Sequence, residues 1–161
     1  MHRTDYEQLN RDLAALSEDV TDPLAVLANA SALLYERLED LNWAGFYRMK
    51  DGRLILGPFQ GKPACVEIAV GRGVCGTAVA EKKTQLVDNV HEFPGHIACD
   101  GASNSEIVVP FVFAGQIAGV LDIDSPVFCR FSSDDRAGLE AFVSVLEAIL
   151  SRLPCSACTL I

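Results

Sequence analysis

Residues 107–124, IVVPFVFAGQIAGVLDID, decide the fold. They form two apolar runs, Ile107 to Phe113 and Gln116 to Asp124, which meet at Ala114-Gly115. Two apolar runs joined across a short turn that contains glycine predict a β-hairpin. Pro110 is awkward in a central strand, because proline has no N–H to donate to a neighbouring strand. We therefore expect an antiparallel sheet with this hairpin in it.

The segments before and after this hairpin predict further strands and helices. Trp43 to Met49 and Arg53 to Phe59 flank Lys50-Asp51-Gly52, which is typical of another hairpin. Leucines recur at helical spacing over residues 6–41, which indicates two helices. Ser132 and the residues after it are typical of a helix cap, and this last helix is expected to run to about Leu153.

The middle of the chain is less regular. Cys65 to Val70 and Thr84 to Val87 are expected to be strands, and a glycine-rich turn at residues 71–76 leads into a short helix near Thr77 to Lys82. Residues 88–105 show no periodicity, and loops of that length in compact domains are usually functional or disordered. We expect this loop to be functional.

Together these elements predict an α+β fold, a central antiparallel sheet of about six strands with N- and C-terminal helices packed on it. The chain has 161 residues, half of them apolar, which suits one domain with its own core. We expect a single domain over residues 1–161, with 154–161 as a flexible tail.

The charge pattern argues against several classes of partner. The net charge is -9 and the 13 Lys and Arg residues are scattered, so no basic surface for nucleic acid is expected. The N-terminus lacks the apolar core of a signal peptide, and no run of about 18 apolar residues occurs. We expect a cytoplasmic protein that does not enter a membrane. In that compartment the six cysteines suggest redox chemistry or metal binding.

A two-residue repeat places Trp43, Gly45 and Tyr47 on one face of their strand. Two aromatic rings on either side of a residue without a side chain have the shape of a slot. The alternative is that both rings pack in the core under a helix, as isolated aromatic pairs commonly do.

The same repeat places Asp122 and Asp124 on one face at the end of an apolar strand. Neighbouring carboxylates repel, so one of them should have a raised pKa if the site is partly buried. The alternative is a strand end that faces solvent, or a turn before Pro126. Glu106, at the start of the partner strand, could likewise be partly buried with a raised pKa or face solvent.

Three cysteines, Cys65, Cys75 and Cys99, fall on loops around the expected sheet and can meet in space. A zinc site competes with redox chemistry, but only His96 and Cys99 have the spacing of a ligand pair, and we expect no metal. Cysteines in apolar surroundings are often inert core residues, which is the alternative for Cys65 and our expectation for Cys129.

The tail carries a C-x-x-C formed by Cys155 and Cys158, beyond the last helix. A thioredoxin-like motif needs a strand before it and a helix after it, and a prenylation box is a weak pattern without an upstream basic segment. We therefore expect the tail to be non-catalytic. The run Gly71-Arg72-Gly73 matches neither a dinucleotide fingerprint nor a phosphate loop.

Six motifs, distributed over about residues 5 to 150, occur together in this chain. They are Asn42 to Tyr47, Gly57 to Lys62, Gly71 to Gly76, His96 to Asp100, Ser103 to Val108 and Gly119 to Ser125. In these motifs the sequence resembles the GAF-domain free methionine-(R)-sulfoxide reductases. The resemblance is specific, because three cysteines, the aromatic pair and three carboxylates match at once.

The resemblance implies a six-stranded GAF fold and a pocket closed by the loop that bears Cys99. It implies that Cys99 is the nucleophile, that Cys65 recycles it, and that Cys75 is an alternative partner. Glu106 and Asp124 would take part in catalysis. The substrate-binding positions implied by the resemblance are Trp43, Tyr47, Glu106, Asp122 and Asp124.

The implied activity is thiol-dependent reduction of free L-methionine-(R)-sulfoxide to L-methionine. Cys99 would become a sulfenic acid, form an intramolecular disulfide, and be reset by thioredoxin, with no cofactor. The oligomeric state stays open, with a homodimer as one candidate. The chief alternative is a GAF module that senses a small ligand or a redox change without catalysis, and a zinc-binding protein is a weaker one.

Overall fold

The computed structural model describes residues 3–97, 99 and 101–154. Its helices are α1 (Tyr6–Leu16), α2 (Pro23–Arg37), α3 (Gly73–Glu81) and α4 (Ser133–Ser151), with a short 3-10 turn, η1 (Val90–Glu92). Its strands are β1 (Trp43–Lys50), β2 (Arg53–Gly61), β3 (Glu67–Ala69), β4 (Gln85–Val87), β5 (Ser105–Phe113) and β6 (Gln116–Ser125). The strands form one antiparallel sheet in the order β3-β2-β1-β6-β5-β4, which confirms the predicted α+β fold.

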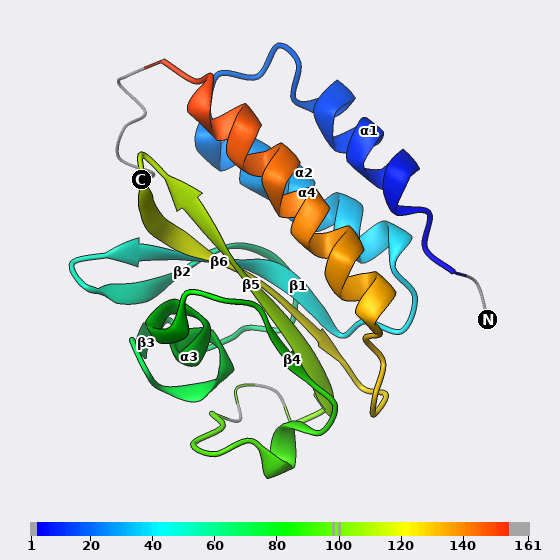
Figure 1. Cartoon of the computed structure of the whole chain (residues 1–161), viewed down its shortest axis with the longest axis vertical. Helices are drawn as coiled ribbons and strands as arrows, with labels where there is room; N and C mark the ends of the chain where they lie inside the picture. The colour runs from blue at the N-terminus through cyan, green and yellow to red at the C-terminus, as the bar shows by residue number, and fades with distance from the viewer. Residues whose placement is uncertain (1–2, 98, 100, 155–161) are drawn as a thin grey trace.

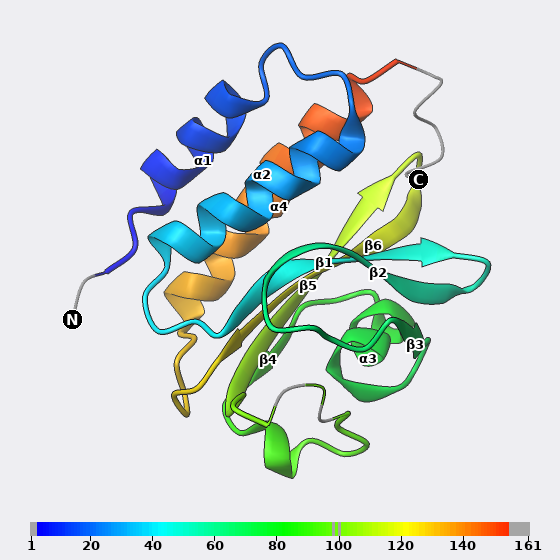
Figure 2. The same cartoon turned by 180° about the vertical axis from the view of Figure 1, so that it is seen from behind.

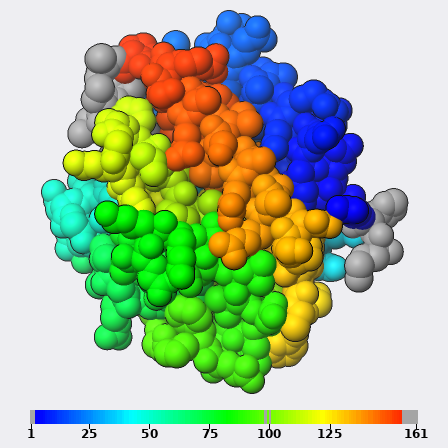
Figure 3. All heavy atoms as spheres, viewed as in Figure 1, coloured from blue at the N-terminus to red at the C-terminus, as the bar shows by residue number. Residues whose placement is uncertain are grey.

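The sheet separates two layers of helices (Figures 1 and 2). Helices α2 and α4 lie against one face, and α1 lies outside them against α4. Helix α3 covers the other face, where the irregular segment between β4 and β5 also lies. In the space-filling view α1 (blue) and α4 (orange) run side by side, and the other half of the surface combines the green segment that contains α3 with the yellow-green β5–β6 hairpin above it (Figure 3).

The two-residue repeat of the central strands decides what each face buries. In β6, Leu121 and Ile123 join the large core under α2 and α4, whereas Val120 belongs to a smaller core on the α3 side. Strand β1 divides in the same way, with Phe46 in the large core and Tyr47 in the smaller one. The large core therefore lies on one face, and the buried carboxyl groups of Glu106 and Asp122 lie on the face that α3 covers.

Pro110 is accommodated because β5 is covered over only part of its length. Strand β4 pairs with Glu106 to Val108 and ends before the proline. Pro110 keeps its place opposite Val120 of β6 on the other side. At Pro110, β5 therefore has a neighbouring strand on one side only, so the missing N–H of the proline leaves no partner strand without a hydrogen bond.

Some predicted boundaries shift by a few residues. Helix α3 begins at Gly73 rather than Thr77, and β5 begins at Ser105 rather than Ile107. The early start of α3 depends on glycine, because a Cβ on Gly76 would lie 2.4 Å from the carbonyl oxygen of Ala69 in β3. The glycine-rich stretch therefore brings the helix backbone against the sheet instead of only preceding the helix.

Helices α2 and α4 begin with side-chain caps, and the one at Ser132 was predicted. The Asp22 carboxylate accepts a hydrogen bond from the N–H of Leu24 at 2.8 Å, at the start of α2. Ser132 and Asp135 form a reciprocal capping box at the start of α4. None of the helices in the described part of the chain has the length and apolar character needed to cross a bilayer.

The capping residue Asp135 also ties α1 to α4. The Tyr6 hydroxyl donates a 2.6 Å hydrogen bond to Asp135 Oδ1, and the partly buried Arg130 guanidinium pairs with Oδ2 at 3.3 Å. The Tyr6 ring lies directly on Gly138, where an added Cβ would be 2.2 Å from the ring. Gly138 therefore allows the two helices to approach closely.

We expect Gly138→Ala to destabilise the protein by about 1–3 kcal/mol, the usual cost of overpacking. Helix propensity alone predicts the opposite sign, because alanine is better than glycine in a helix by about 1 kcal/mol. Urea unfolding measures the difference, and the same change in a Tyr6→Ala background is the matched control, in which the penalty should vanish. A stabilising Gly138→Ala in the otherwise native chain would contradict the close contact.

Candidate active site

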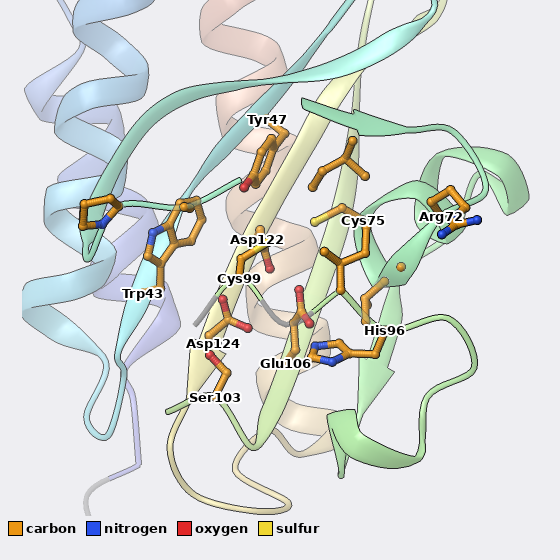
Figure 4. Close-up of a pocket in the computed structure, with 16 residues that line it drawn as sticks. Trp43, Tyr47, Arg72, Cys75, His96, Cys99, Ser103, Glu106, Asp122 and Asp124 are labelled. Carbon is orange, nitrogen blue, oxygen red and sulfur yellow. The ribbon is translucent and has the colours of Figure 1, made fainter. Parts of the chain in front are cut away.

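A pocket lies on the α3 side of the sheet, between β1, β5 and β6, the start of α3, and the loop that carries Cys99 (Figure 4). It brings together the predicted residues Trp43, Tyr47, Cys75 and Cys99 with the carboxylates that the next paragraphs describe. The space left inside is about 40 Å³. That is room for one or a few water molecules.

A disulfide joins Cys65 to Cys99 beside the pocket, with 5.6 Å between their Cα atoms. Cys65 lies just before β3, and Cys99 lies 34 residues later in the loop between β4 and β5. The two cysteines that the resemblance relates are therefore the two that meet. The bond also ties the Cys99 loop across the pocket.

The polar atoms of the aromatic pair hold the segment that ends at Cys65. The Tyr47 hydroxyl donates a hydrogen bond to the carbonyl oxygen of Cys65 at 2.9 Å, and the Trp43 indole N–H donates one to the carbonyl oxygen of Lys62 at 3.1 Å. Both aromatic residues are buried. Their position thus controls where Cys65 lies relative to the Cys99 loop.

The slot expected between the two rings is not open. The Trp43 and Tyr47 rings stack with their centroids 5.9 Å apart, and Phe59 of β2 also stacks with Trp43, at 5.1 Å. Gly45 lies against Phe59 instead of forming a floor, because a Cβ there would be 2.3 Å from Phe59 Cβ. The aromatic residues therefore make one wall of the pocket, and sequence periodicity alone did not reveal Phe59.

Three carboxyl groups line the opposite part of the pocket. Glu106 of β5 faces Asp124 of β6 in the sheet register, and Asp122 is two residues earlier on the same face. Glu106 and Asp122 are each only 6% exposed, whereas Asp124 is partly buried. The alternative of a strand end facing solvent is therefore wrong for Glu106 and Asp122.

Burial dominates the proton affinity of these acids. It raises the pKa of Glu106 well above the ordinary value, and the charges of Asp122 and Asp124 raise it further. Burial also raises the pKa of Asp122, although hydrogen bonding with Glu106 and Cys75 acts against this. The site therefore keeps a proton where exposed carboxylates would have lost theirs.

The thiol beside these acids is that of Cys75. It is 4% exposed, lies in the first turn of α3, and takes no part in the disulfide. Burial raises its pKa well above the ordinary value, followed by the charges of Asp122 and Glu106. Cys75 is thus a neutral thiol that hydrogen-bonds with Asp122.

The loop that bears Cys99 has anchors that the sequence analysis did not identify. The Asn42 side-chain N–H donates a 2.9 Å hydrogen bond to the buried Ser103 hydroxyl, which fixes the end of the loop beside β1. His96 also lines the pocket, and burial lowers its pKa. Asn42 and Ser103 lie in the predicted motifs, and that position was the only sequence signal for them.

Cys129 does not lie in the core as expected. It is exposed in the turn between β6 and α4, where its N–H donates to the Asp88 carbonyl oxygen at 3.0 Å. Its φ of 55° is that of a tight turn, which a buried strand position would not require. Cys155 and Cys158, with almost all of the expected tail, lie outside the described residues.

Comparisons with known proteins agree with this architecture. A GAF domain family model matches residues 22–151. The free methionine-R-sulfoxide reductase of Escherichia coli K12 is 61% identical over 152 residues, which cover 94% of this chain and 92% of that protein. The free methionine-R-sulfoxide reductase of Saccharomyces cerevisiae is 44% identical, over 88% of this chain and 83% of that protein.

Solved structures lead to the same group. The reductase of Staphylococcus aureus in complex with substrate has a TM-score of 0.89 and 51% identity, over 93% of this chain and 98% of that one. The free methionine-R-sulfoxide reductase of Neisseria meningitidis, also in complex with its substrate, has a TM-score of 0.87 and 40% identity, over 91% of this chain and 90% of that one. With its fold, its pocket and these relatives, the chain belongs to the GAF-domain family of free methionine-R-sulfoxide reductases, which are oxidoreductases.

Proposed function

We propose that this protein reduces free L-methionine-(R)-sulfoxide to L-methionine, with Cys99 as the nucleophile and Cys65 as the recycling cysteine. The observation that carries the proposal is the Cys65–Cys99 disulfide beside a pocket lined by buried acids. Reduction of a sulfoxide needs a soft nucleophile and a proton for the departing oxygen in one place. The pocket combines these two requirements, and relatives that share 61% and 44% of their residues carry the name of this activity.

The chemistry balances in three steps. The Cys99 thiolate attacks the sulfoxide sulfur, the oxygen takes up a proton and is transferred to the cysteine, and methionine leaves with Cys99 as a sulfenic acid. The Cys65 thiol then attacks the sulfenic sulfur and water is released, which forms the disulfide. A dithiol reductant, for which we propose thioredoxin in the cytoplasm, reduces the bond and is itself oxidised.

The acids have separate roles in this scheme. Glu106 is buried and has a raised pKa, so it holds the proton that the sulfoxide oxygen needs. Asp124 and Asp122 lie on the facing strand and accept hydrogen bonds from the substrate ammonium. A charged group moved out of water requires such partners, because an unpaired buried charge is costly.

The substrate carboxylate has a natural partner at the start of α3. Gly73 and Val74 lie in the first turn of this helix and line the pocket. The first N–H groups of a helix have no carbonyl partner within it and attract anions. The N-cap residue Arg72, which makes no side-chain cap, adds a positive charge beside the same pocket.

The size of the pocket assigns the disulfide form to one stage of the cycle. Ligand sites usually enclose about 300–1,000 Å³, far more than the 40 Å³ left here. The substrate therefore does not fit while the bond ties the Cys99 loop across the pocket. Reduction frees the loop, so that product release and substrate entry follow the resetting step.

Cys75 is not required for recycling in this proposal. Its thiol is buried among the acids and has a raised pKa, which makes it a poor nucleophile toward a sulfenic acid. Its hydrogen bond with Asp122 instead keeps that carboxyl in position.

The two disulfide cysteines should differ in single-turnover experiments. Cys99→Ser is expected to release no methionine, because it lacks the nucleophile. Cys65→Ser is expected to release about one methionine per site and then stall with thioredoxin, because only resolution is lost. Cys129→Ser is the matched control and should turn over normally. Stoichiometric methionine from Cys99→Ser would show that Cys99 is not the nucleophile. Steady turnover by Cys65→Ser would indicate that Cys75 resolves the sulfenic acid instead.

Glu106→Gln should slow the single turnover by roughly tenfold to a thousandfold, because it removes the proton donor. In the native enzyme the rate should fall as the pH rises through the raised pKa of Glu106, and this alkaline fall should be absent in the variant. Rapid-quench rates across pH measure both effects, with the exposed Glu92→Gln as the control. An unchanged rate and pH profile would show that water is the proton source.

The same change should stabilise the fold at alkaline pH. A carboxyl whose pKa is raised by folding contributes stability below its unfolded pKa, near 4, and this contribution is lost as the pH rises toward the folded value. Glu106→Gln has no such loss, so its Tm should exceed the native Tm above neutral pH and approach it in acid. Thermal unfolding at several pH values tests this, and a Tm difference independent of pH would contradict the buried state of Glu106.

The pocket should reject a substrate without free charged groups. In an N-acetylated, C-amidated R-sulfoxide both charges are replaced by amides, so the acids and the α3 N–H groups lose their partners. Such losses can discriminate by roughly 10⁴ or more. We expect kcat/KM to be high only for the free R-sulfoxide, and very low for the free S-sulfoxide and the blocked compound. Equal values for the blocked and free compounds would mean that the pocket is open and that the acids do not bind the ammonium.

A further inference from the structure

Three buried side chains converge in the pocket without being part of the disulfide. They are Cys75 from α3, Glu106 from β5 and Asp122 from β6 (Figure 4). The Cys75 Sγ and a carboxylate oxygen from each acid all lie within 4.8 Å of one another. Each side chain offers a donor atom that metal ions use in proteins.

One of these donor atoms, a carboxylate oxygen of Asp122, lacks a hydrogen-bond partner among the described residues. Asp122 Oδ1 is buried and has no hydrogen-bond partner among the described residues, although the carboxyl as a whole interacts with Glu106 and Cys75. Asp122 is more than nine-tenths buried, so bulk water does not replace the missing partner. A buried acceptor left without a partner destabilises the fold, because its lost hydration is not replaced. The oxygen is therefore available to a positive group that enters the pocket.

The size of the remaining space restricts what that group can be in the disulfide form. About 40 Å³ is too small for an amino acid, as argued above, but it holds an ion with one or two waters. We propose that Cys75, Glu106 and Asp122 bind a zinc-class divalent cation, and that neither Cys65 nor Cys99 is a ligand of it. This donor set differs from the His96 and Cys99 pair, whose spacing was considered for zinc and not favoured, since Cys99 is occupied by the disulfide.

The donor chemistry favours zinc over the harder cations. Mg²⁺ and Ca²⁺ prefer an all-oxygen shell, whereas a thiolate with two carboxylates suits Zn²⁺. Three protein ligands leave a fourth tetrahedral position for a water molecule in the remaining space. Two of the ligands are acids that the proposed function gives to the substrate and its proton. If that function holds, bound zinc and substrate exclude each other, and zinc would keep the oxidised enzyme out of use.

The test uses the full chain with Cys129, Cys155 and Cys158 changed to serine, so that no surface or tail thiol binds metal. The protein is kept in the disulfide form without thiol reductants, which would themselves bind zinc. Zn²⁺ binding is measured by competition with a chromogenic chelator, and Co²⁺ is used as a spectroscopic probe. We expect one ion per chain and, with Co²⁺, an ultraviolet thiolate-to-metal charge-transfer band.

Cys75→Ser and Asp122→Asn in that background should each weaken Zn²⁺ binding by more than the roughly tenfold to hundredfold that loss of an outer-shell partner costs. Cys75→Ser should also remove the charge-transfer band. The double variant Cys65→Ser, Cys99→Ser is the matched control and should keep the band, because neither residue is a ligand. Circular dichroism and Tm confirm that each variant is folded, and Cys75→Ala provides a second thiol deletion.

Each outcome decides between the two proposals. Absence of the band in the parent, or its survival in folded Cys75→Ser and Cys75→Ala, overturns the metal site and leaves the reductase untouched. Loss of the band only in the Cys65 and Cys99 double variant also overturns it, because the ion would then depend on those cysteines. The zinc titration does not measure turnover, so it tests the metal site independently of the reductase activity. A chain that fails the turnover experiments above but binds zinc through Cys75 would keep the metal site and lose the proposed function.

Discussion

The two-residue repeat of β1, β5 and β6 is the constraint on which the rest of the structure depends. Side chains alternate across a strand, so a residue and its neighbour cannot share a face. Ile107, Leu121 and Ile123 pack under α2 and α4, and this packing fixes the register. Glu106 and Asp122 must then face α3. The burial of the acids follows from the apolar contacts behind the sheet.

That placement is unfavourable for folding and useful for chemistry. Two buried carboxyls and a buried thiol within 4.8 Å of one another would repel strongly if all were charged. The protein avoids this charge by keeping protons on the group, as the raised pKa of Glu106 and of Cys75 indicates. Burial of these groups lowers the stability of the fold, and it keeps a proton on Glu106, where a sulfoxide oxygen would need one.

The disulfide depends on contacts from a distant part of the sheet. Tyr47 and Trp43 of β1 hold the carbonyl oxygens of Cys65 and Lys62, while the Asn42 to Ser103 hydrogen bond holds the end of the loop that carries Cys99. One strand and the residue before it therefore position both cysteines. The aromatic pair, which the sequence suggested as a binding slot, acts structurally as a support for Cys65.

The sequence by itself determined which segments form most of the strands and helices, to within a few residues, and which of the site residues share a face of a strand. These features depend on local periodicity and on short-range hydrogen bonds. It also carried the motifs that identify the family, and with them the relation of Cys65 to Cys99. Only the tertiary structure decided that Phe59 fills the space over Gly45, that Cys129 is exposed, and that Cys75 contacts the acids. Each of these depends on the approach of two segments distant in the chain, and no local pattern specifies that distance.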